Sequence, residues 1–101
     1  MPIKVALQTI YNVKKQEIVP RAALLDRILP IGDASFPLLQ YIDEYGNTVS
    51  NGRQMPQFLK EWDVIVGMAE SGDDRKVLLE IRDIAVRCKD EPHLFLRFIG
   101  D

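Results

Sequence analysis

Cysteine and histidine are nearly absent from this chain, which has one of each, Cys88 and His93. A single cysteine cannot form an intramolecular disulfide, so the chain is not a disulfide-stapled secreted scaffold, and we expect a reducing, cytoplasmic location. A single histidine, with no cysteines at ligand spacing around it, gives no metal-binding motif. We therefore expect no bound metal.

Long apolar runs are also missing. No window approaches the ~20 apolar residues that a membrane-spanning helix requires, so the sequence predicts no membrane association. The segment Met1–Tyr11 lacks a basic leader followed by a long apolar stretch. We interpret it as part of the fold and not as a signal peptide.

The chain has no strong excess of either charge. Thirteen Lys and Arg stand against fifteen Asp and Glu, which gives a formal net charge of -2 and a pI near 5.4. A dedicated nucleic-acid-binding domain is usually basic, so we expect no nucleic-acid partner. No glycine-rich phosphate loop or other cofactor motif is present, and no cofactor is expected.

What the chain does contain is enough apolar sequence for one core. It has 101 residues, of which 47% are hydrophobic and 28% charged. This length and composition predict a single folded domain over residues 1–101 that needs neither disulfides nor a metal.

The first half of the chain predicts strands and one short helix. Alternating apolar residues predict a strand over 3–10, and 17–19 is a candidate short strand. Pro20 and Pro30 bracket a short helix over 21–29. A near-continuous apolar run predicts a strand over 36–42, followed by a turn at 43–47 and a return strand over 47–50. In this hairpin, Asp43 bonds the turn backbone and Gly46 takes the left-handed conformation of a G1 bulge.

The second half predicts two helices and a final strand. Pro56 can open a helix over 56–69, with Trp62 on its apolar stripe and therefore in the core. A second helix over 74–89, capped by Ser71 or Asp73, places Cys88 on its apolar face. Residues 93–99 alternate so regularly that we expect an interior strand, with Phe95, Arg97 and Ile99 on one side of it.

These elements predict an α+β fold. It consists of a mixed or antiparallel sheet of three or four strands, a helical hairpin packed on one face, and one short extra helix. The order of the strands does not follow from the sequence.

Two segments carry a resemblance to a known group. They are FPLLQYIDEYGNTVSN (36–51) and the ending EPHLFLRFIGD (91–101). They resemble a group of short, uncharacterised bacterial proteins that share a strand-and-hairpin segment of this form and a similar ending. That group has Pro, Asp and an aromatic residue where this chain has Glu44, Asn47 and Ser50. The resemblance implies a bacterial cytoplasmic origin and no particular chemistry.

No pair of residues is arranged for catalysis. Cys88 could act as a nucleophile beside His93, but its place on an apolar helical stripe favours a core residue. Asp43 and Glu44 are adjacent in sequence, which does not suit a pair of catalytic carboxylates. Polar and aromatic residues that suit recognition of a partner gather around the expected hairpin and the terminal strand: Tyr41, Asp43, Tyr45, Asn47, Asn51, Arg53, Gln54 and His93.

Two classes of function fit this pattern. The first is a non-enzymatic protein-interaction or regulatory module, such as an immunity or antitoxin-like protein, whose partner is another protein. The second is a small ligand-binding protein or enzyme that uses His93 with Asp43 and Tyr45. The sequence favours the first and leaves the oligomeric state open. Convergence of those three side chains in one pocket would favour the second.

Overall fold

The structure of this chain is a computed structural model that describes residues 2–100. Met1 and Asp101, the last residue of the terminal motif, lie outside the described residues. In chain order the strands and α-helices are β1 (Lys4–Thr9), β2 (Lys14–Ile18), α1 (Leu24–Ile28), β3 (Asn47–Asn51), α2 (Met55–Gly67), α3 (Gly72–Asp90) and β4 (Leu94–Ile99). Three short 3-10 helices accompany them, η1 (Arg21–Ala23), η2 (Leu39–Tyr41) and η3 (Gly52–Gln54).

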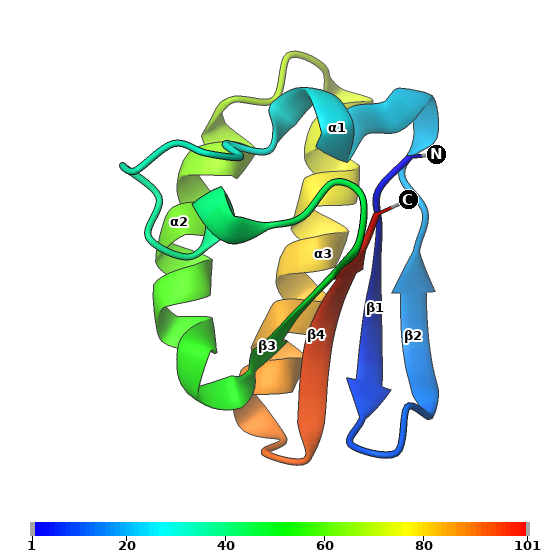
Figure 1. The fold of residues 1–101 in the computed structure, drawn as a ribbon. Coiled ribbons are helices and arrows are strands. Elements are labelled where there is room, and N and C mark those ends of the chain that lie inside the picture. The colour runs from blue at the N-terminus through cyan, green and yellow to red at the C-terminus, as the bar shows by residue number, and fades with distance from the viewer. Residues whose placement is uncertain (1, 101) are drawn as a thin grey trace.

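The four strands form one antiparallel sheet in the order β2-β1-β4-β3 (Figure 1). The terminal strand β4 lies between β1 and β3, which confirms that it is an interior strand. Leu7 stands opposite Leu96, and Val5 stands opposite Phe98. Residues paired in this way point to the same face, so these apolar side chains form one side of the core.

Helices α2 and α3 pack on one face of the sheet, which confirms the α+β class with a helical hairpin on one face (Figure 1). Trp62 of α2 is fully buried and stacks on Phe58, with ring centroids 5.2 Å apart. Its Nε1 donates a hydrogen bond to the carbonyl oxygen of Leu78 on α3, at 2.9 Å. Phe98 of β4 lies 6.0 Å from Trp62 between ring centroids. The expected position of Trp62 between helices and sheet is confirmed.

Residues 36–42 do not form a strand, so that prediction is wrong. The segment folds into turns and η2. A side chain of α2 satisfies its backbone, because the carboxylate of Glu61 accepts hydrogen bonds from the N–H groups of Leu38 and Leu39, each at 3.0 Å. Leu39 and Ile42 are buried in the core. A short apolar run looks the same in the sequence whether it lies in a sheet or in a loop packed on a helix.

The predicted hairpin of 36–42 with 47–50 is wrong as well, because β3 pairs with β4. The chain does turn at 43–46, where the N–H of Tyr45 donates to Oδ1 of Asp43 at 2.8 Å, as in an Asx turn. Gly46 does not have a positive φ; among the described glycines it is Gly32 that does. Gly46 instead lies where an added Cβ would stand 2.7 Å from Oδ2 of Asp43.

The helix expected over 21–29 is shorter in the structure. Helix α1 covers only Leu24–Ile28, because Ala22 and Ala23 have φ angles of 55° and 52°. Left-handed residues of this kind cannot continue a right-handed helix. Leu29, which precedes Pro30, is extended, as expected.

The remaining predicted elements are present with small shifts. Strand 3–10 corresponds to β1, the candidate strand 17–19 to the end of a longer β2, and 47–50 to β3. Helices 56–69 and 74–89 correspond to α2 and α3. Within residues 2–100, no helix is both long enough and apolar enough to cross a membrane.

Candidate functional site

One face of the sheet carries no helix, and we call it the uncovered face. The register of the strands defines it, because residues directly opposite one another point to the same side. Ala6 stands opposite both Glu17 and Arg97, and Arg97 stands opposite Val49. The same reasoning assigns the following side chains to this face: Lys4, Ala6, Gln8, Lys14, Glu17, Asn47, Val49, Asn51, Phe95, Arg97 and Ile99.

Arg97 of β4 occupies the middle of the uncovered face. Its Nη1 donates a hydrogen bond to Oε1 of Gln8 on the neighbouring strand, at 3.2 Å. Its Nε is enclosed and has no hydrogen-bond partner among residues 2–100. An enclosed donor without an acceptor costs about 1–3 kcal/mol. No carboxylate of the described residues forms an ion pair with this guanidinium.

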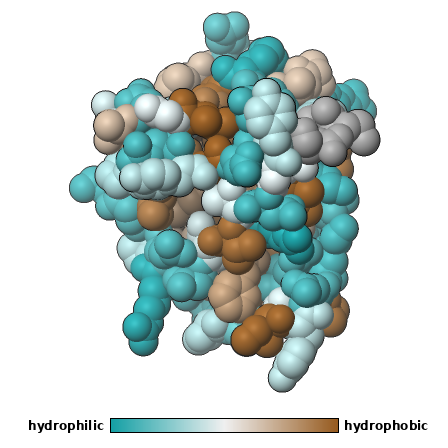
Figure 2. Space-filling model, in the orientation of Figure 1, coloured by the Kyte–Doolittle hydropathy of each residue, from teal (hydrophilic) through white to brown (hydrophobic). Residues whose placement is uncertain are grey.

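A hollow of about 320 Å³ lies beside Arg97. Its lining combines the aromatic ring of Phe95 and two exposed apolar side chains, Val49 and Ile10, with the polar residues Gln8, Thr9 and Asn12. Arg97 is the charged residue of the lining. Figure 2 shows apolar side chains gathered on the lower middle of the viewed face, bordered by hydrophilic ones. The hollow therefore offers apolar contact next to one positive charge.

A second hollow, of about 490 Å³, opens on the other side of Phe95. It lies at the end of β3, and its lining is Asn51, Gly52, Arg53, Lys89, Pro92 and Phe95. Two cations and no carboxylate line it. Both hollows next to Phe95 thus favour an anionic group.

The uncovered face as a whole is basic. Three cations, Lys4, Lys14 and Arg97, stand against one carboxylate, Glu17, which gives the face a formal charge of +2. Lys14 hydrogen-bonds to Glu17, and Lys4 Nζ lies 3.8 Å from Glu17 Oε2. The hydrogen bond from Lys14 is the main cause that lowers the pKa of Glu17. The protein carries a net charge of -2, so its charge is distributed unevenly over the surface.

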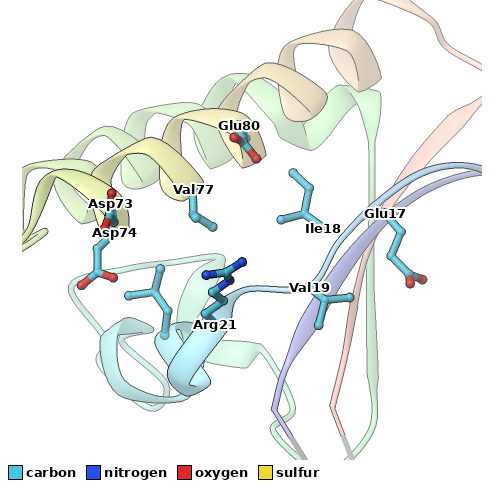
Figure 3. Close-up of a pocket in the computed structure, with 9 residues that line it drawn as sticks. Glu17, Ile18, Val19, Arg21, Asp73, Asp74, Val77 and Glu80 are labelled. Atoms are coloured by element: carbon cyan, nitrogen blue, oxygen red, sulfur yellow. The ribbon is translucent and has the colours of Figure 1, made fainter.

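A third hollow, of about 330 Å³, lies between β2, η1 and α3 and has the opposite character. Its lining includes the carboxylates of Asp73, Asp74 and Glu80, and Figure 3 shows the guanidinium of Arg21 reaching into it. Asp73 and Asp74 lie in the first turn of α3, where negative charge stabilises the helix end. Among residues 2–100, no group of three or more His, Cys, Asp or Glu side chains could hold a metal ion.

The structure brings only part of the predicted binding cluster to the uncovered face. Asn47 and Asn51 lie on it, and Arg53 lines the second hollow. Gln54 has a structural role instead, because its Oε1 accepts the N–H of Asn51 while Oδ1 of Asn51 accepts the N–H of Gln54. This capping box orders η3.

Tyr41 and Tyr45 are highly exposed, at 73% and 76%, around the 43–46 turn. The carboxylate of Asp43 accepts a hydrogen bond from the backbone N–H of Tyr45 within that turn. None of these three residues lines either hollow next to Phe95. They form a separate exposed corner of the molecule.

His93 is far from that corner. It directly precedes β4, whereas the 43–46 turn meets the other end of this strand, where the N–H of Gly100 bonds to the carbonyl oxygen of Gly46. The strand between them has six residues, which span about 20 Å. The structure does not bring His93 together with Asp43 and Tyr45.

Cys88 is fully buried, as its place on the apolar stripe predicted. Burial raises the pKa of its thiol to about 11. A thiol that remains protonated and enclosed is a poor nucleophile.

Most of the residues that line the hollows next to Phe95 were not among the predicted binding residues, and these include Gln8, Lys89, Phe95 and Arg97. The alternation of β4 held a usable signal, because it places Phe95 and Arg97 together on the side opposite the core. Gln8 and Lys89 gave no comparable signal, since the structure brings Gln8 next to Arg97 and Lys89 into one hollow with Arg53, and these partners are far away in the sequence.

No protein-family model, curated protein or solved structure matches this chain.

Proposed function

We propose that this chain is a non-enzymatic protein-binding module whose partner docks an acidic side chain over Arg97 on the uncovered face. Arg97 carries the proposal, because within residues 2–100 its guanidinium has one neutral hydrogen-bond partner, one enclosed donor without a partner, and no ion pair with a carboxylate. A carboxylate from outside would supply the missing negative charge through the terminal nitrogens of the guanidinium, because Nε itself is enclosed.

The surroundings of Arg97 support a protein partner. The adjoining hollow of about 320 Å³ is large enough for a side chain, and Phe95 and Val49 offer it apolar contact. Tyr, Trp, Phe and Arg are the residues on which binding energy usually concentrates at protein interfaces. A single-stranded nucleic acid would need successive aromatic platforms, whereas Phe95 is the one aromatic residue of this face.

A binding face of this kind suits a regulatory role. An immunity or antitoxin-like protein needs only to cover a surface of its partner and performs no chemistry. The separation of His93 from Asp43 and Tyr45, and the enclosed thiol of Cys88, give the enzymatic alternative no support. We place this activity in the cytoplasm of a bacterium, consistent with one free cysteine and with the resemblance of residues 36–51 and 91–101.

Site-specific photocrosslinking tests the proposal. A benzoylphenylalanine residue replaces Val49, which is 54% exposed on the uncovered face, or Val64, which is 52% exposed on α2. The two positions have the same residue type and nearly the same exposure, so they differ in the face that they report. We expect an adduct with a protein other than this chain from position 49 and none from position 64, with the crosslinked peptide of the partner containing Asp or Glu.

Arg97→Gln should abolish this adduct with another protein at position 49, whereas Arg75→Gln, the same change at an exposed position of α3, should leave it intact. Equal adducts with another protein from both positions, or such an adduct that survives Arg97→Gln, would show that the uncovered face is not the binding surface. A nucleic-acid adduct at position 49 would overturn the choice of a protein partner.

A further inference from the structure

The two edges of the sheet differ in how they are protected. Edge strand β2 carries Lys14, Lys15 and Glu17, and a register irregularity interrupts its pairing with β1 at Leu7 and Gln8. Charges and bulges of this kind prevent a free edge from pairing with another chain. Edge strand β3, with the sequence NTVSN, has no charge, no proline and no register shift. From this difference we infer that β3 is a self-association edge, along which two copies of the chain pair antiparallel with Val49 at the two-fold axis.

The hydrogen-bond pattern shows which groups of β3 are available. The N–H of Gly100 bonds to the carbonyl oxygen of Gly46, and bonded pairs alternate along an antiparallel ladder. Thr48 and Ser50 therefore exchange bonds with β4, and the N–H and C=O groups of Asn47 and Val49 point outward. The N–H of Asn51 also points away from β4, where it donates to Oε1 of Gln54.

Antiparallel pairing of two β3 strands uses these outward groups. With Val49 opposite Val49 of the second copy, the two valines exchange two hydrogen bonds, and their side chains meet on the uncovered face. Asn47 stands opposite Asn51 of the second copy. At each end of the paired strands, the N–H of Asn47 in one copy can therefore donate to the carbonyl oxygen of Asn51 in the other. No bond of the existing capping box has to break.

The charges around β3 favour a second copy of this chain over an unrelated strand. Asp43 and Glu44 precede β3, whereas Arg53 follows it and lines the second hollow with Lys89. In an antiparallel pair, the acidic turn of each copy lies at the end where the basic hollow of the other copy opens. This complementarity occurs twice because the pair is symmetric.

Sedimentation equilibrium with wild type and two variants of Val49 tests the pairing. The wild type should reach twice the chain mass of 11.6 kDa as concentration rises. Val49→Pro removes the outward N–H and leaves the hydrogen bonds to β4 in place, a change that edge strands tolerate. This variant should remain monomeric with an unchanged circular dichroism spectrum. Val49→Thr keeps the N–H and should still dimerise.

A charge swap gives an independent test that does not alter the ladder. Arg53→Glu removes the charge contact at both ends of the symmetric dimer and should weaken the dimer at least about tenfold, which corresponds to about 1.4 kcal/mol for the two contacts together. Adding Glu44→Arg should restore it. Arg97→Gln should leave the dimer unchanged, which separates this inference from the proposed binding of an acidic partner.

The inference fails if the wild type is monomeric up to about 1 mM, a concentration at which an association free energy of about −4 kcal/mol would be detected. It also fails if a folded Val49→Pro variant still dimerises, because the contact then lies elsewhere. If Val49→Pro does not fold, the charge swap decides, and the absence of rescue by Glu44→Arg overturns the antiparallel register.

Discussion

Replacement of Glu61 should release the whole 36–42 segment from the body of the protein. Glu61 is only 5% exposed, and its carboxylate accepts the N–H groups of Leu38 and Leu39 as well as Nε2 of Gln57. The Glu61→Ala variant would leave the two backbone donors without an acceptor and loosen the attachment of Leu39 to the core.

The expected cost follows from these bonds. A hydrogen bond to a charged group contributes about 1.5–3 kcal/mol. We take the lower value for each of the two backbone bonds, because the substitution also removes the desolvation cost of a buried carboxylate. Glu61→Ala should therefore lower the free energy of unfolding by about 3 kcal/mol, a large share of the 5–15 kcal/mol typical of a domain. Glu61→Gln retains one acceptor oxygen and should cost less, about 1–2 kcal/mol.

Urea denaturation followed by circular dichroism measures this change. With a slope of about 1–3 kcal/mol per molar urea, the midpoint for Glu61→Ala should fall by about 1–3 M. Asp63→Ala is the matched control, because Asp63 lies two residues away on α2 and its carboxylate is exposed and, within residues 2–100, bonds only to Arg82. An exposed ion pair of this kind contributes at most about 1 kcal/mol.

Amide hydrogen exchange gives the residue-level test of the same reasoning. In Glu61→Ala, the amides of Leu38 and Leu39 should exchange much faster, while exchange of the β4 amides should quicken only in proportion to the loss of global stability. A variant with wild-type stability and wild-type exchange at these two amides would show that the carboxylate of Glu61 does not hold this segment.

Three further perturbations test other parts of the fold. Gly100→Ala should destabilise the protein by about 1–3 kcal/mol in the same urea assay, because an added Cβ would lie close against the carbonyl oxygen of Glu44; an unchanged midpoint would refute the close packing of the chain end on the turn. Trp62→Ala should cost about 3–5 kcal/mol, and native fluorescence with the red-shifted maximum of a solvated indole would contradict its burial. Because burial raises the pKa of Cys88 from 9.0 to about 11, the folded state holds this proton while the unfolded state loses it, so stability should fall as pH rises from 9.0 to about 11, by about 2 kcal/mol relative to Cys88→Ala. Parallel pH profiles for both proteins would count against an enclosed thiol.

Local patterns in the sequence determined the elements whose signals lie within a few residues. The period-two alternation of 93–99 identified β4 and its buried face, and the helical stripe identified Trp62 as a core residue. Ser71 was one of two predicted caps, and its Oγ accepts the N–H of Asp74 at 3.1 Å at the start of α3. Each of these features depends on backbone geometry that neighbouring residues set by themselves.

Only the tertiary structure decided the features that join distant residues. The apolar run 36–42 has the composition of a strand, but Glu61, more than twenty positions later, supplies the acceptors that keep it out of the sheet. β3 pairs with β4 across about fifty residues of sequence and not with the segment just before it. The arrangement of Arg97, Gln8 and Phe95 also depends on the strand order. Local sequence patterns specify which face of each helix or strand is apolar. Which other element packs or pairs with it depends on how all the elements together satisfy their hydrogen bonds and fill one core.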